Sequence, residues 1–179
     1  MKNSYMTVET TFMPGCACFS FQSDKDIQNG AIVGKGELIE GEDSIYAATD
    51  DYSGGMYLVA NPAWDYDTSR KENQNEENFI NKAGIPFRVY ELKKDRKYTV
   101  GNLPSSVTLE KGDFVEFKDG AYAKASGTQL KVAAIKEGGF PFFVGSYGTP
   151  VEGDTTNEFG YALGTKNTKY TKYTIEVTA

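Results

Sequence analysis

Two sixteen-residue segments of this chain resemble each other, and each has the pattern of a β-hairpin. Residues 33–48 read VGKGELIEGEDSIYAA, and residues 109–124 read LEKGDFVEFKDGAYAK. Six of the aligned positions are identical: Lys35/Lys111, Gly36/Gly112, Glu40/Glu116, Asp43/Asp119, Tyr46/Tyr122 and Ala47/Ala123. Self-similarity of this kind indicates a supersecondary unit that is used more than once. The match therefore predicts two related β units.

The turn residues of the two segments support the hairpin interpretation. In the second segment Asp119-Gly120 separates two β-rich runs, which is the strongest short-range hairpin signal. In the first segment residues 41–44 form the turn. Each segment also contains a Lys-Gly-acid triplet, which we expect to open a turn because glycine accepts a positive φ. A lone hairpin is marginally stable in water, so both hairpins must pack on further strands.

The rest of the sequence favours an all-β protein. Its 179 residues include 12 Tyr, 11 Phe and 19 Gly, a composition typical of short strands with frequent turns. We expect a β-sandwich or β-barrel-like fold of antiparallel hairpins, with at most one short helix near residues 72–83. Residues 1–22 are predicted to be an extended N-terminal arm, residues 23–102 a first β unit and residues 103–179 a second, all of which can pack as one compact domain.

Period-two alternation predicts three individual strands. In residues 16–21, Phe19 and Phe21 share one face, and Cys18 lies on the other. Residues 85–92 form a second strand, in which Phe87, Val89 and Glu91 share a face. The C-terminal stretch 170–177 is predicted to close a sheet as the last strand.

The residue types argue against an enzyme. The chain has no histidine, which removes the commonest general base and any Ser-His-Asp or Cys-His arrangement within it. The carboxyl pairs Asp50-Asp51 and Asp65/Asp67 are interpreted as solvated turn residues. Cys16 and Cys18 lack the further soft or nitrogen ligands that a metal site needs, and we expect reduced thiols. The prediction is no catalytic residue, no cofactor and no metal.

Charge and hydropathy narrow the range of partners. The net charge is −6 and the basic residues are scattered, so we expect no nucleic-acid partner. No apolar run approaches the roughly 18 residues of a membrane helix, so we expect no membrane partner. The first residues do not read as a signal peptide, which predicts synthesis in a cytosol.

Residues 27–120 resemble the capsid decoration, or auxiliary head, proteins of tailed bacteriophages that infect Gram-positive bacteria. The pattern is clearest over residues 79–100, FINKAGIPFRVYELKKDRKYTV. The matching residues there are Phe79, Asn81, Ala83, Gly84, Arg88, Tyr90, Leu92, Asp95, Tyr98, Thr99 and Val100. Further matches are Asn29-Gly30 through Gly36, Tyr46, Tyr57, Leu58, Val59, Ala60, Pro62 and residues 111–115. Lys94 departs from the pattern, because the family usually has glycine there.

The resemblance implies a virion structural protein on the outer surface of a phage head, which stabilises contacts between major capsid subunits. The implied partner is the major capsid protein, and self-association is left open. Aromatic or arginine side chains such as Trp64, Tyr66, Arg88 and Tyr90 are candidate anchors, but the capsid-contact residues are not assigned. Two alternatives remain: a tail-tube or head–tail junction protein, and a carbohydrate- or host-surface-binding β module that uses Trp64 as a stacking platform.

Overall fold

The computed structural model describes residues 8–9, 13–62, 79–101, 103, 107–126, 129–138 and 170–178. Its strands are β1 (Val8–Glu9), β2 (Cys18–Gln22), β3 (Ile32–Leu38), β4 (Ile45–Thr49), β5 (Met56–Val59), β6 (Phe87–Glu91), β7 (Lys97–Gly101), β8 (Phe114–Lys118), β9 (Ala121–Ala125), β10 (Leu130–Gly138) and β11 (Tyr170–Val177). No helix occurs in these ranges, so the predicted all-β class is confirmed. Most of the predicted helical segment near 72–83 lies outside the described residues, and residues 79–83 contain a β-bridge and the start of a turn.

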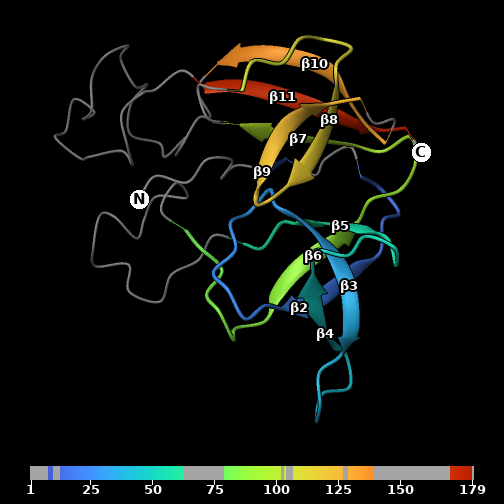
Figure 1. The fold of residues 1–179 in the computed structure, drawn as a ribbon, viewed down its shortest axis with the longest axis vertical. Coiled ribbons are helices and arrows are strands. Elements are labelled where there is room, and N and C mark those ends of the chain that lie inside the picture. The colour runs from blue at the N-terminus through green and yellow to red at the C-terminus, as the bar shows by residue number, and fades with distance from the viewer. Residues whose placement is uncertain are drawn as a thin grey trace, which may run out of the picture.

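The strands form two sheets, one closed and one open (Figure 1). A closed barrel has the order β2-β4-β3-β5-β6, and a six-stranded sheet has the order β1-β7-β11-β10-β8-β9. In Figure 1 the barrel occupies the lower part of the molecule and the open sheet the upper part. All pairings are antiparallel except β2 with β4, which is parallel. Closure removes unpaired strand edges from the barrel.

Alternation along the barrel strands determines which side chains fill its interior. Phe21 on β2 pairs with Phe87 on β6, and both are buried. Val89 follows Phe87 on the same face and is also fully buried, whereas Cys18 on β2 is exposed. The predicted faces of residues 16–21 and 85–92 are therefore confirmed, although the second strand begins at Phe87.

The C-terminal strand lies in the interior of the open sheet rather than at its edge. β11 is paired with β10 on one side and with β7 on the other. Ile175 and Val177 are fully buried, and Tyr173 is nearly so. The end of the chain thus supplies a central strand of this sheet.

Tyrosine hydroxyls connect the open sheet to the barrel. Tyr122 on β9 donates a hydrogen bond of 2.6 Å to the carbonyl of Gly30, which precedes β3. Tyr52, in the loop after β4, donates one of 3.2 Å to the carbonyl of Phe117 on β8. Tyr98 is fully buried beside Tyr122, and this burial raises the pKa of its hydroxyl well above the ordinary range. Both sheets contribute to one continuous core.

Both matched segments form hairpins, but their strands pair differently. β3 pairs with β4 in the barrel, and β8 pairs with β9 at one end of the open sheet. Tyr46 lies opposite Leu38, whereas Tyr122 lies opposite Phe117. In the gap-free alignment Leu38 corresponds to Phe114, which instead pairs with Ala125. The sequence match therefore does not correspond to a repeated strand register.

The matched glycines also have different structural roles. Gly112 lies in a turn at φ +100, as the Lys-Gly-acid triplet predicts. Gly36 lies within β3, where an added Cβ would be 2.7 Å from the carbonyl oxygen of Ala47. The predicted turn at Gly36 is therefore wrong, because close approach of two strands explains this glycine. The predicted Asp119-Gly120 turn is confirmed, since both residues have positive φ.

The chain passes from one sheet to the other between β6 and β7. The predicted boundary after residue 102 does not mark this change, because β7 pairs with β11 in the open sheet. The segment 1–22 contributes to both sheets, since β1 pairs with β7 and β2 belongs to the barrel. The division into an arm and two units stays a prediction.

The turn at residues 94–95 lies where Lys94 departs from the pattern described above. Asp95 in this turn has φ +64.

Candidate functional site: a braced loop beside the barrel

Two asparagine side chains, those of Asn29 and Asn81, tie together chain segments that are distant in sequence. Asn29 donates a hydrogen bond of 2.8 Å to the carbonyl of Asn61, whose amide returns one of 3.0 Å to Asn29 Oδ1. Asn81 Nδ2 donates to Asn29 Oδ1 at 3.1 Å and to the carbonyl of Ile27 at 3.0 Å. Asn29 and Asn81 are buried. These bonds connect the segment before β3, the end of β5 and the segment before β6.

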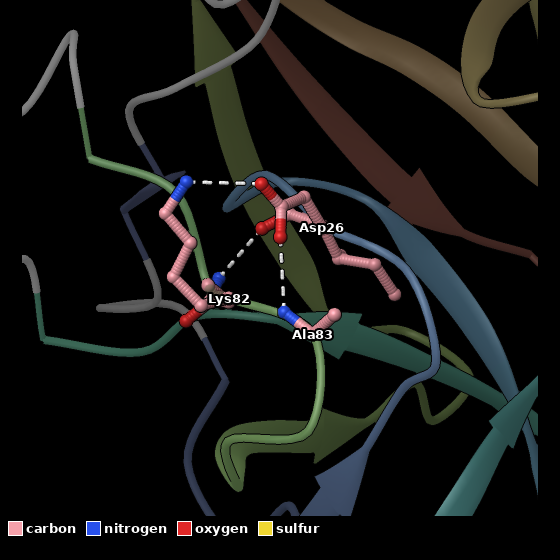
Figure 2. A network of polar contacts seen from close by, with 5 residues as sticks. Asp26, Lys82 and Ala83 are labelled. Atoms are coloured by element: carbon pink, nitrogen blue, oxygen red, sulfur yellow. Dashed lines mark hydrogen bonds and ion pairs between the residues drawn. The ribbon is translucent and has the colours of Figure 1, made fainter.

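Asp26 holds the loop that follows Asn81 (Figure 2). Its carboxylate accepts a hydrogen bond of 3.0 Å from the backbone amide of Ala83 and forms an ion pair of 3.0 Å with Lys82. The Ala83 amide, and then the Lys82 ammonium, hold the pKa of the Asp26 carboxyl below its ordinary value of 3.8. The carboxylate therefore fixes both the backbone and a side chain of the loop.

Backbone bonds complete the support of this loop. The amide of Gly84 donates to the carbonyl of Ser23 at 2.8 Å, and the amide of Ile85 donates to the carbonyl of Lys82 at 3.1 Å. Gly84 has φ +74, which favours glycine at that position. We call residues 82–86 the braced loop, because Asp26 and Ser23 hold it from outside.

The braced loop presents an apolar side chain to solvent. All five of its residues are exposed, and Ile85 is 58% exposed. A single exposed isoleucine is ordinary on a protein surface. Here, however, its backbone is already fixed, so little conformational entropy remains to be lost when a partner covers it. The arrangement suits a contact with another protein.

The carboxyl groups singled out in the sequence have turn-forming roles or lie outside the described residues. No group of three acidic or cysteine side chains in the described ranges could hold a metal ion. Asp51, from the predicted carboxyl pair, accepts hydrogen bonds from the amide and hydroxyl of Ser53, which lower its pKa and give it a turn-forming role. Asp65 and Asp67 lie outside the described residues. Within the same ranges, no helix is long and apolar enough to cross a membrane.

The other residues singled out in the sequence are not brought together in one site. Arg88 is exposed on β6 and Tyr90 is half-buried, while Trp64 and Tyr66 lie outside the described residues. Cys16 and Cys18 are both free thiols, and Cys18 is exposed. Sequence reasoning missed Asp26 and assigned Ile85 to a strand. The Gly84-Ile85-Pro86 run was the available signal, since glycine and proline on either side of a residue are typical of a loop.

Comparisons with protein-family models, curated proteins and solved structures found no match to this chain. The structure therefore defines the class of fold alone, an all-β protein that joins a closed barrel to an open sheet.

Proposed function

We propose that this chain is a virion structural protein that decorates the outer surface of a phage head and stabilises contacts between major capsid subunits. The observation that carries the proposal is the braced loop, which holds an exposed Ile85 on a fixed backbone. The family resemblance supports it, because Asn29, Asn81 and Gly84 belong to the matching pattern and hold or form this loop. The protein would be made in the host cytoplasm and located on the finished head.

The physical role of such a loop is to fill a depression between neighbouring subunits. Fully burying an isoleucine contributes about 1.5–3 kcal/mol, and more than half of the Ile85 surface is still available. Because Asp26 and Ser23 fix the loop in advance, little of this gain would be lost to ordering the loop on binding. The major capsid protein is the proposed partner.

The proposal can be tested with heads purified from a phage mutant that lacks this protein. Wild-type protein should bind these heads, and Ile85→Asp should weaken binding by roughly tenfold or more, since a charge would replace the apolar contact. Leu38→Asp is the matched control, because Leu38 is a second exposed large hydrophobic residue, 46% exposed, on β3. Equal binding of wild type and Ile85→Asp would overturn the role of the loop, and no binding of either would overturn the capsid proposal.

The alternative functions differ in what they predict for the purified protein. A tail-tube or junction protein would form rings in solution. A carbohydrate-binding module would bind glycans and lose that binding in Trp64→Ala. Trp64 lies outside the described residues, and the braced loop favours a protein partner instead.

A further inference from the structure

The interior of the barrel is apolar except at one end, where charged side chains face inward. Residues that lie opposite each other on neighbouring strands share a face of the sheet. Tyr57 lies opposite Val33 on one side and Glu91 on the other, and Val33 is two residues from Lys35 on the same strand. Lys35 and Glu91 therefore share the inward face with Tyr57.

Two aromatic rings lie against the ammonium group of Lys35. Its Nζ atom lies 3.9 Å from the centroid of the Tyr46 ring and 5.1 Å from that of Phe19. The Phe19 ring meets the Tyr57 ring edge to face at 5.6 Å and the Tyr46 ring at 6.4 Å. We call Phe19, Tyr46, Tyr57 and Glu91 the aromatic mouth of the barrel, with Lys35 as the cation within it.

Exposure suits this mouth to a cation that can leave. Glu91 at the rim is partly exposed, and its carboxylate is paired with the Lys93 ammonium at 3.3 Å. Lys35 is itself only half-buried. A cation that gives up its hydration water easily binds more strongly to the face of an aromatic ring, because the attraction is larger when the cation is desolvated. The Lys ammonium is strongly hydrated, whereas methylated ammonium groups are not.

We propose that the aromatic mouth is a binding site for methylated or quaternary ammonium groups, and that Lys35 occupies it in the free protein. Lys35 is tethered to the site and competes at a high effective concentration. An external ligand must therefore displace it, and the site is partly closed by the chain's own side chain. This inference does not depend on a capsid role.

Tetramethylammonium chloride is the probe, followed by NMR of the aromatic resonances in the full chain. Lys35→Ala should bind it saturably, with shifts at Tyr46 and Phe19 and a Kd roughly tenfold lower than that of the wild type. Lys111→Ala is the matched control, since Lys111 is the aligned lysine and lies exposed in a turn. It should bind like the wild type. Adding Tyr46→Leu to Lys35→Ala should abolish the saturable shifts.

A neutral molecule of the same shape separates cation binding from simple filling of space. tert-Butanol should produce no saturable shifts in Lys35→Ala, and equal binding of the two molecules would overturn the proposal. In the wild type, ring currents should shift the Lys35 methylene protons upfield, and tetramethylammonium should return them toward random-coil values. The displacement of Lys35 would be contradicted if these methylene protons stayed upfield at saturating tetramethylammonium. It would also be contradicted if folded Lys35→Ala did not bind the probe.

Discussion

The β3–β4 and β8–β9 hairpins have similar sequences but are built and used differently. The β8–β9 ladder is regular, with five consecutive pairs and a two-residue turn. The β3–β4 ladder shifts register between Lys35 and Leu38 and is closed into a barrel. Tyr122 is 1% exposed and hydrogen-bonded to Gly30, whereas Tyr46 is half-buried beneath the Lys35 ammonium. The two hairpins share residues that favour strands and turns, but the burial and contacts of each matched residue depend on the sheet in which it packs.

Truncating the two aligned tyrosines should give the largest difference in stability between the two hairpins. Tyr122→Ala should lower the free energy of unfolding by about 3–5 kcal/mol, because it empties a core site that cannot collapse fully. Tyr46→Ala should cost only about 1–2 kcal/mol, since its ring is half-buried and less apolar area is lost. Urea denaturation measures both values. Equal losses would contradict the difference in packing.

The aligned glycines should respond differently to side-chain size. Gly36→Ala should cost about 1–3 kcal/mol, because the new Cβ would meet the Ala47 carbonyl. Gly112→Ala should cost about 1–2 kcal/mol from its positive φ alone. Gly36→Leu should then be clearly worse than Gly36→Ala, whereas Gly112→Leu should match Gly112→Ala, since no atom lies within 4 Å of its added Cβ. Thermal or urea unfolding of the four variants decides the point.

Removing only the hydroxyl groups should give a smaller difference. Tyr122→Phe leaves the Gly30 carbonyl without its 2.6 Å partner and should cost about 1 kcal/mol. Tyr46→Phe should change stability by less than about 0.5 kcal/mol, because its hydroxyl bonds to no described residue. The same urea experiment serves as the measurement. A larger loss at Tyr46 than at Tyr122 would show that the hydroxyl of Tyr122 does not join the sheets.

Asp26 and Asp113 allow a similar comparison, in which the expected effect is the smallest and is confined to single backbone amides. Asp113 accepts the amide of Glu110 and pairs with Lys124, so it supports a local turn, while Asp26 joins segments far apart in sequence. Asp26→Asn should therefore speed hydrogen exchange at the Ala83 amide by several-fold, as expected when a charged acceptor becomes neutral. Asp113→Asn should affect the Glu110 amide and leave that of Ala83 unchanged.

The pH dependence of the Asp26 brace has a definite sign. The pKa of the folded carboxyl lies below 3.8, its ordinary value, so its contribution is complete above that pH. The contribution is lost as the pH falls through the lower folded value. Exchange at the Ala83 amide, corrected for the intrinsic rate, should accelerate below about pH 4. Unchanged protection down to pH 2 would contradict a role for the carboxylate charge.

The sequence predicted local features better than their assembly. Alternation identified the inward faces of β2 and β6, and Asp119-Gly120 identified a turn, because both depend on neighbouring residues. The register of β3 with β4 was not predictable, since it depends on the close approach of Gly36 to Ala47. The braced loop was missed for the same reason: Asp26 and Ala83 are 57 residues apart in sequence.

The proposed function rests on this chain being part of a phage particle. The most direct measurement is quantitative mass spectrometry of purified virions of the phage that is proposed to encode it. If the chain decorates the head, it should be present in an amount comparable with that of the major capsid protein and be retained on heads separated from tails. Absence from the virions, or recovery only with the tails, would contradict it.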